Sequence, residues 1–143
     1  MSCIFCRIIA GDIKAEVIAR EPGAFAFLDV TPLADGHVLI VPDAHVARIE
    51  DLSASDAAAL FRAVVALAGP VRDAVGAAGS TIGINNGEAT GQTIPHVHVH
   101  IVPRWPGDGG GSVHSIFTAK PRRSLPEVGA AIRARIDASK DAP

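Results

Sequence analysis

Apolar residues recur at helical spacing in two long stretches of the chain. A Ser-x-x-Asp pattern that begins at Ser53 precedes one apolar series, which consists of Leu60, Val64, Leu67, Val71 and Val75. This spacing keeps one face apolar, so it predicts a long helix that continues with a kink through Gly69-Pro70. Ser124 and Glu127 form a second capping pattern before Val128, Ile132 and Ile136, which predicts a C-terminal helix.

Short apolar runs rich in β-forming residues, bounded by proline and glycine, predict strands. They cover residues 16–20, 24–30, 36–42, 80–85 and 95–104. Residues 3–11 instead carry apolar side chains at helical spacing and predict a short helix that ends at Gly11. Because most strands follow one another directly, we expect an α+β fold in which the long helix packs on an antiparallel sheet of about five strands.

The composition is that of a globular protein, with 143 residues, 48% hydrophobic and 20% charged. We expect one domain over 1–143, with its core at about 3–104 and a loop and helix over 105–143. The net charge of −2 provides no general attraction to nucleic acid or to anionic membranes, so we expect neither as a partner. The N-terminal apolar stretch is short and interrupted by Arg7, and no run approaches the roughly 20 apolar residues of a membrane span, which favours a cytoplasmic protein.

The two cysteines, Cys3 and Cys6, have Cys-x-x-Cys spacing. In a reducing compartment this spacing is typical of half a metal site or of a redox pair, and it also occurs without a function. A thioredoxin-like pair would follow a strand, for which residues 1–2 leave no room. The cysteines alone do not decide between the three interpretations.

Three of the six histidines, His96, His98 and His100, occupy alternate positions of the last predicted strand. Alternation places them on one face, opposite valine and isoleucine, with the outer two about 13 Å apart. A single metal could not take all three without distortion, so we expect different roles; a solvated polar face is the alternative. Neutral imidazole is a good nucleophile toward phosphorus, and the donor-rich loop at 85–93 is typical of a phosphate cradle.

The run HVHVHIV at residues 96–102 resembles the His-φ-His-φ-His-φ-φ signature of the histidine triad (HIT) superfamily of nucleotide hydrolases and transferases. The segments CIFCRIIAGDI, AFLDVTPLADGHVLIVPDAH and NNGEATGQT occur in the order found in bacterial Hint-like members. The resemblance covers nearly all of the chain up to Arg104. Pro95 departs from the family pattern, and residues 105–112 do not match the C-terminal substrate-contacting segment of the Hint branch. The segment PRWPGD at 103–108 instead resembles HIT branches that act on dinucleoside polyphosphates.

The resemblance implies a catalytic group and a nucleotide-binding group. His98 would be the nucleophile, His100 would donate to the phosphate, His37 would be the fourth histidine near it, and Thr93 would lie in the leaving-group loop. The resemblance places Asp29 at the ribose and Asn85 and Gln92 at the phosphate. It places a purine pocket at Ile4, Phe5, Ile8, Phe27 and Val30.

The resemblance also implies a structural zinc ion, held by Cys3, Cys6, His45 and His96, and a homodimer. Two thiolates and two imidazoles make a closed tetrahedral zinc site. His96 would then hold the metal while His98 does the chemistry.

The activity that follows is cleavage at the α-phosphate of nucleoside 5′-phosphoramidates or related adenylated substrates, through a nucleotidyl-histidine intermediate. One alternative keeps the nucleophile but hydrolyses or phosphorolyses diadenosine polyphosphates. Two others are a nucleotide-binding regulatory protein with incidental activity and a protein that uses the histidine row for a metal other than zinc.

Overall fold

The computed structural model describes residues 3–140. By its internal contacts the chain divides into two compact units, Met1–Gly110 and Gly111–Pro143. The first unit contains the sheet, the long helix and every histidine but His114. Each unit is described separately below.

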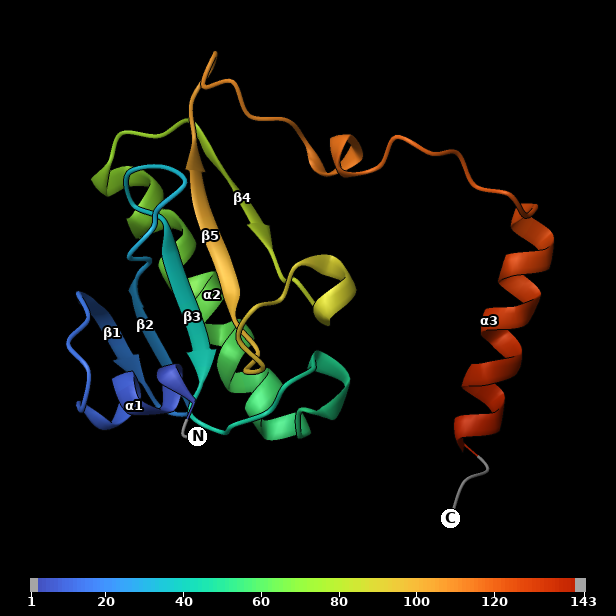
Figure 1. Ribbon diagram of the computed structural model, residues 1–143, viewed down its shortest axis with the longest axis horizontal. Coiled ribbons are helices and arrows are strands. Elements are labelled where there is room, and N and C mark those ends of the chain that lie inside the picture. Colours follow the sequence, from blue (N-terminus) through green and yellow to red (C-terminus); the bar gives the residue numbers. More distant parts are fainter. Residues whose placement is uncertain (1–2, 141–143) are drawn as a thin grey trace. The chain divides into compact units, whose positions relative to one another are not determined.

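The first unit is built on a five-stranded antiparallel sheet with the strand order β1-β2-β3-β5-β4 (Figure 1). This confirms the architecture expected from the sequence. The strands are β1 (Val17–Glu21), β2 (Ala24–Leu28), β3 (Val38–Pro42), β4 (Gly79–Gly83) and β5 (Val99–Arg104). Three-residue 3₁₀ turns, η1 (Ile49–Asp51) and η2 (Glu88–Thr90), lie in the connections.

One face of the sheet is covered by the long helix α2 (Ala54–Ala74), which is continuous through Pro70. Ser53 caps it by accepting a hydrogen bond from the backbone N–H of Asp56 at 3.1 Å. By length and composition α2 could cross a membrane. However, its buried side packs against β2, β3 and β5 in the main core, so it is the core helix of this unit.

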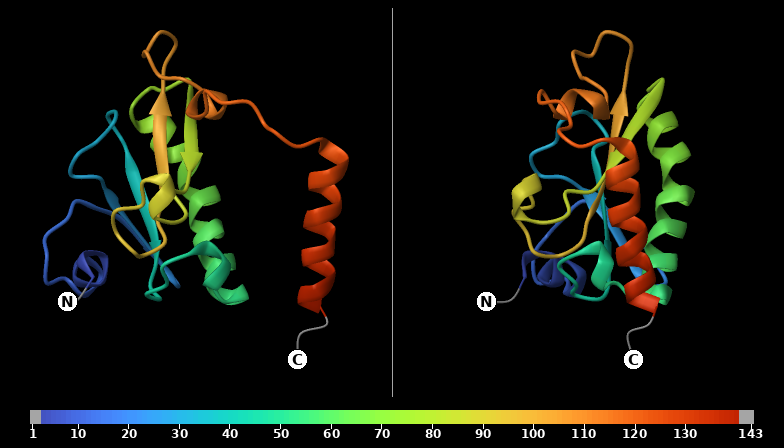
Figure 2. Two further views of the ribbon diagram at one scale, coloured as in Figure 1. Left: turned by 45° about the vertical axis from the view of Figure 1, so that its right-hand side comes forward. Right: turned by 90° about the vertical axis from the view of Figure 1, so that its right-hand side faces the viewer.

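The opposite face of the sheet carries α1 (Ile4–Ala10), so the sheet lies between α1 and α2 (Figure 2). Phe5 and Ile8 of α1 form a second core cluster with Phe25, Phe27, Leu39 and Val41. The helix ends at Gly11, where φ is +85° and the backbone N–H bonds to the carbonyls of Arg7 and Ile8. Strand alternation therefore builds two cores on the two faces of one sheet.

The histidine strand begins later than the sequence predicts, because β5 starts at Val99. The prediction of strand for 95–98 is wrong: Val97 donates its N–H to the carbonyl of Val46 at 2.7 Å, outside the sheet ladder. Pro95 lacks a backbone donor, which agrees with pairing that starts only after it. The two-sided pattern nevertheless holds, since Val97 and Val99 are both buried in the α2-side core.

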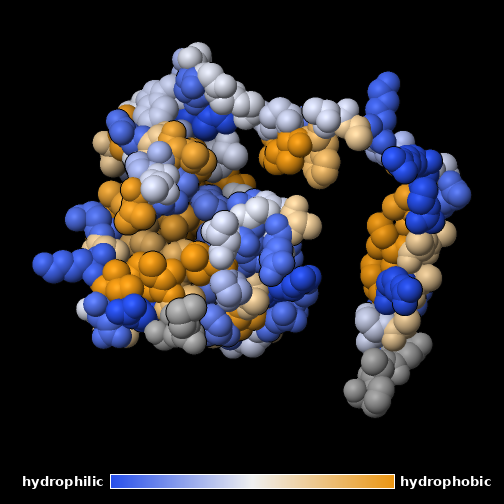
Figure 3. Space-filling model, viewed as in Figure 1, coloured by the Kyte–Doolittle hydropathy of each residue, from blue (hydrophilic) through white to orange (hydrophobic). Residues whose placement is uncertain are grey.

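The second unit contains a short 3₁₀ turn, η3 (Val113–Ile116), in a segment expected to be irregular, and the helix α3 (Leu125–Lys140). The predicted cap is present: Ser124 donates its N–H and its hydroxyl to the Glu127 carboxylate at 2.9 and 2.7 Å. Apolar side chains gather along one side of α3 (Figure 3). They include Ile132 and Ile136, each about half exposed.

Candidate active site and metal centre

The histidines predicted for function lie on the α1 side of the sheet and are brought together there. The ring of Phe5 meets those of His96 and His98 edge-on, at centroid distances of 5.9 and 5.2 Å. The His98 ring lies 5.0 Å from that of His100, which lies 5.2 Å from that of His37. At one end of the row, His96 lies close to the thiols of Cys3 and Cys6. At the other end, His100 lies close to the carboxylate of Asp29.

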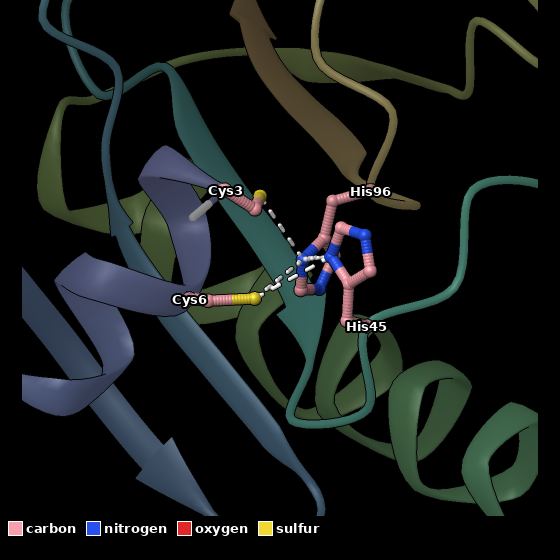
Figure 4. Close-up of side chains that lie close together, drawn as sticks. All are labelled: Cys3, Cys6, His45 and His96. Atoms are coloured by element: carbon pink, nitrogen blue, oxygen red, sulfur yellow. Dashed lines mark hydrogen bonds between the residues drawn. The ribbon is translucent and has the colours of Figure 1, made fainter. Parts of the chain in front are cut away.

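At the first end, Cys3, Cys6, His45 and His96 point their donor atoms toward one another (Figure 4). They come from three places: the start of α1, the loop after β3 and the segment before β5. The two imidazole Nδ1 atoms are 3.3 Å apart. The Cys6 sulfur is 3.4 Å from Nδ1 of His45 and 3.6 Å from that of His96, and the Cys3 sulfur is 3.6 Å from His96 Nδ1.

These distances test whether the residues fit a metal. Usual zinc bond lengths require tetrahedron edges of about 3.3 Å between two nitrogens and about 3.6 Å between nitrogen and sulfur. The four separations agree with these edges within about 0.2 Å. The Nε2–H of His96 donates to the carbonyl of Pro42 at 2.9 Å, so its Nδ1 lone pair faces the thiols. The cluster could therefore hold a metal ion.

The middle histidine, His98, is buried and has one ring nitrogen engaged. Its Nδ1 lies 2.7 Å from the backbone carbonyl of His96, which accepts and cannot donate. The proton of neutral His98 is therefore on Nδ1, and the lone pair is on Nε2. This is the arrangement that an imidazole nucleophile needs.

At the other end of the row, a backbone amide sets the tautomers of two histidines. Leu33 donates its N–H to Nδ1 of His37 at 3.1 Å, so neutral His37 carries its proton on Nε2. That atom lies 2.9 Å from Nδ1 of His100 and donates to it. The remaining His100 proton is therefore on Nε2, a buried atom with no hydrogen-bond partner among residues 3–140.

The electrostatic environment keeps these two rings neutral at neutral pH. Burial lowers the pKa of His100 to about 4, and the neighbouring His98 and His37 act in the same direction. Burial also lowers the pKa of His37, against the opposing charge of Asp29 at 3.7 Å. Both therefore act as neutral imidazoles, and His100 presents an N–H donor.

The loop between β2 and β3 holds His37 and Asp29 in place. Thr31 donates its N–H and hydroxyl to one Asp29 oxygen, at 2.9 and 3.2 Å, which closes a tight turn. Gly36 has a φ of +80°, and a Cβ there would lie 3.0 Å from the side chain of Val75. Any other residue at 36 would therefore be strained in the path that leads to His37.

The donor-rich loop at 85–93 is fastened to the first unit by side-chain amides. Gln92 accepts from the N–H of Gly87 at 2.7 Å and donates to the carbonyl of Ala47 at 2.8 Å. Asn86, which sequence reasoning missed, accepts from the N–H of Ile49 and donates to Glu50. Asn85 and Thr93 are exposed on this loop. Gln92 thus fastens this loop, while its predicted phosphate contact stays a prediction.

The residues expected to form a purine pocket fall into two groups. Phe5, Ile8 and Phe27 are buried in the α1-side core, whereas Ile4 is 44% and Val30 84% exposed. Only the exposed pair presents much side-chain surface to a ligand. The Leu33 amide could not be found from the sequence, because a backbone donor leaves no residue-type signal.

Comparison with known proteins agrees with this geometry. Residues 10–107 match the model of the HIT domain. An adenosine 5′-monophosphoramidase from Schizosaccharomyces pombe is 38% identical over 104 residues, which cover 73% of this chain and 75% of that protein. An asymmetrical bis(5′-nucleosyl)-tetraphosphatase from the same organism is 38% identical over 67% of this chain and 53% of its own length.

Among solved structures, a zinc-bound histidine triad family protein from Mycobacterium smegmatis superposes with a TM-score of 0.73 at 33% identity. The superposition covers 97% of this chain and 98% of that one. The family match, the two-sided sheet and the histidine row lead to one conclusion. The chain belongs to the HIT family, whose enzymes are nucleotide hydrolases and transferases.

Proposed function

We propose that this protein cleaves nucleoside 5′-phosphoramidates, or related adenylated substrates, at the α-phosphorus through a nucleotidyl intermediate on His98. The observation that carries the proposal is the bond from His98 Nδ1 to the His96 carbonyl, which leaves the Nε2 lone pair available. The similarity to an adenosine 5′-monophosphoramidase supports the substrate class.

In the first step, Nε2 of His98 attacks the α-phosphorus and the P–N bond to the leaving amine breaks. The bond electrons go to nitrogen, which takes one proton from solvent and departs as neutral amine. The imidazole becomes cationic, and its Nδ1–H, held by the His96 carbonyl, stabilises that charge. The Nε2–H of His100 donates to a phosphoryl oxygen, and Thr93 and Asn85 supply further donors from the loop.

In the second step, water attacks phosphorus and the P–Nε2 bond breaks, with its electrons returning to His98. Of the two protons that water releases, one replaces the proton consumed earlier and the other converts the amine to ammonium. The products are a nucleoside monophosphate and a protonated amine. Asp29 would hold the ribose through its second carboxylate oxygen, and Gln92 would hold the phosphate loop.

The exposed side chains of Ile4 and Val30 would contact the base. The buried side chains of Phe5, Ile8 and Phe27 would support this pocket from the core. The metal cluster of Cys3, Cys6, His45 and His96 would hold structural zinc, which supplies a closed cross-link and takes no part in the reaction. This cross-link would join α1 to the segment that carries His98.

We further propose that the chain is a single domain, that two copies form a homodimer, and that this dimer is cytoplasmic. Phe61 and Val65 of α2 are 43% and 78% exposed and offer apolar surface for a second copy. Sedimentation of the wild-type protein and of Val65→Glu would test this, since the charge should shift the protein toward monomer.

The test of the activity is intermediate trapping. Protein mixed with adenosine 5′-phosphoramidate labelled at the α-phosphate and quenched in base should retain label on His98 by peptide mass spectrometry. His98→Ala should retain none, and His114→Ala, a histidine outside the first unit, should match the wild type. Turnover by His98→Ala at the wild-type rate would refute the nucleophile, and tight nucleotide binding without turnover would favour the regulatory alternative.

The diadenosine polyphosphatase alternative shares the first step and is supported by the similarity to a tetraphosphatase. Comparing kcat/KM for adenosine 5′-phosphoramidate and for diadenosine tetraphosphate separates the two. We expect the phosphoramidate to be preferred.

A further inference from the structure

Residues 45–50, the brace, follow β3 and contact two parts of the site that lie far apart in the sequence. The carbonyl of Val46 accepts the N–H of Val97 at 2.7 Å, and Val97 directly precedes His98. The rest of the brace binds the donor-rich loop that the proposed reaction uses. The brace therefore fixes where that loop lies relative to the segment of the nucleophile.

The donor-rich loop at 85–93 is fastened to the brace near both of its ends. Near the C-terminal end, the side-chain amide of Gln92 donates to a brace carbonyl at 2.8 Å. Near the N-terminal end, Oδ1 of Asn86 accepts the N–H of Ile49 at 2.9 Å, and Nδ2 of Asn86 donates to the Glu50 carboxylate at 2.7 Å. The carboxamide of Asn86 thus uses both its acceptor and its donor on the brace.

Each fastening residue is the chain neighbour of a donor in the proposed reaction. Asn86 follows Asn85, and Gln92 precedes Thr93. Asn85 and Thr93 are both exposed, so packing does not hold their side chains. Their position depends on the backbone that the two fastening residues fix to the brace.

The Asn86 fastening depends on charge. Arg48 lies 3.6 Å from one Glu50 oxygen, and Asn86 donates to the other. The hydrogen bond from Asn86 lowers the pKa of the Glu50 carboxyl, so Glu50 stays an acceptor and residue 86 has to supply an N–H. An aspartate at 86 would bring two carboxylates together, whereas an amide at 50 would then restore the bond with its direction reversed.

We infer that Asn86 is a positioning residue, whose bonds to Ile49 and Glu50 hold Asn85 where it donates to the transition state of phosphoryl transfer. The inference rests on the proposed function for its reaction and on the brace for its geometry. Asn86 itself contacts the brace and not the substrate. Because Asn85 acts on charge that develops during the reaction, displacing it lowers kcat and leaves ground-state binding of the nucleotide unchanged.

A reversal of the hydrogen bond tests this role. Asn86→Asp should lower kcat for adenosine 5′-phosphoramidate roughly tenfold, because the two carboxylates repel each other and displace the end of the loop. The Kd of AMP, measured by titration calorimetry, should stay within about twofold of the wild-type value. Combining Asn86→Asp with Glu50→Gln should return kcat to within about threefold of wild type, since the amide introduced at 50 can donate to the carboxylate introduced at 86.

The matched control for added charge is Ala89→Asp. Ala89 is exposed on the same loop and makes no side-chain hydrogen bond, so this variant should keep the wild-type kcat. Asn86→Ala removes both bonds without adding charge and should show the same selective fall in kcat. It also tests the inference if Asn86→Asp does not fold, as judged by circular dichroism and melting temperature.

Amide hydrogen exchange provides a readout that needs no turnover. Gly87 is buried and donates its N–H to Gln92 at 2.7 Å. In Asn86→Asp this amide should exchange at least about tenfold faster, while the amides of β3 keep their protection. The double variant should restore the protection of Gly87.

Three results would overturn the positioning role. They are a wild-type kcat in Asn86→Asp, a weaker Kd for AMP with kcat unchanged, and no recovery of kcat in the double variant. A wild-type protein that cleaves no phosphoramidate would refute the proposed function instead. The exchange data would then decide alone whether Asn86 holds the loop, and unchanged Gly87 exchange in Asn86→Asp would show that it does not.

Discussion

The two ends of the histidine row contain the same residue type on the same face, yet their chemistry differs. At His96 the Nε2–H is bound by a carbonyl, and the Nδ1 lone pair meets two thiols and a second imidazole. At His100 the Nδ1 lone pair is bound by His37, and a buried Nε2–H is left for a ligand. The hydrogen bond that each ring makes elsewhere decides which atom it presents, and this separates a metal ligand from an anion donor.

The largest effect is expected between the two ends, at His98. His98→Ala should lower kcat for adenosine 5′-phosphoramidate by at least about 10³-fold, because the nucleophile is lost. Circular dichroism and zinc content should stay close to wild type, since the neighbouring ligands remain. A loss of zinc together with activity would mean that the middle of the row is not separable from its metal end.

Breaking the His100 end should cost less. His37→Phe removes the N–H that donates to His100 Nδ1, so the tautomer of His100 is no longer set, and kcat should fall by roughly 10- to 100-fold. ¹⁵N NMR of the imidazoles should show His100 protonated on Nε2 in the wild type and a mixture of tautomers in the variant. Unchanged His100 signals would contradict the role given to the Leu33 amide.

Removing a metal ligand at the His96 end should lower the stability of the protein more than its kcat. His45→Ala should lose bound zinc and lower the melting temperature, with kcat reduced only a few-fold, because the cross-link lies outside the reaction. His114→Ala is the matched control and should change neither quantity. Equal zinc content in His45→Ala and wild type would contradict the assignment of His45 as the fourth ligand.

The smallest expected effect is at the His100 end and concerns how the free energy of unfolding depends on pH. Burial holds the pKa of His100 at about 4, against an ordinary value of 6.5. Between pH 6.5 and about pH 4 the unfolded chain binds a proton at His100 that the native chain does not bind. This group therefore lowers the free energy of unfolding as the pH falls through that range, and it has no effect on that free energy at higher pH. His100→Asn should weaken that decline in urea unfolding at pH 7 and pH 4.5. An NMR pKa near 6.5 for His100 would contradict the burial argument.

Local patterns were enough to predict most of the elements. The apolar period after Ser53 predicted α2, the capping pair at Ser124 predicted α3, and alternation predicted two-sided strands, because these signals act between residues close in sequence. The start of β5 was mispredicted, because Val97 pairs with Val46 rather than with a strand. Such a long-range partner leaves no periodic signal.

The candidate site divides in the same way. Sequence alone determined that three histidines share a face, since alternation is a local property, whereas the Cys-x-x-Cys spacing left a metal half-site, a redox pair and no function open. The family resemblance implied His45 as a ligand, but only the tertiary structure brings its Nδ1 to 3.4 Å from the Cys6 sulfur and shows that Leu33 sets the tautomers of the other end. It also brings Asn86 into contact with Glu50. These assignments depend on distances between segments far apart in the chain, which packing on the sheet creates.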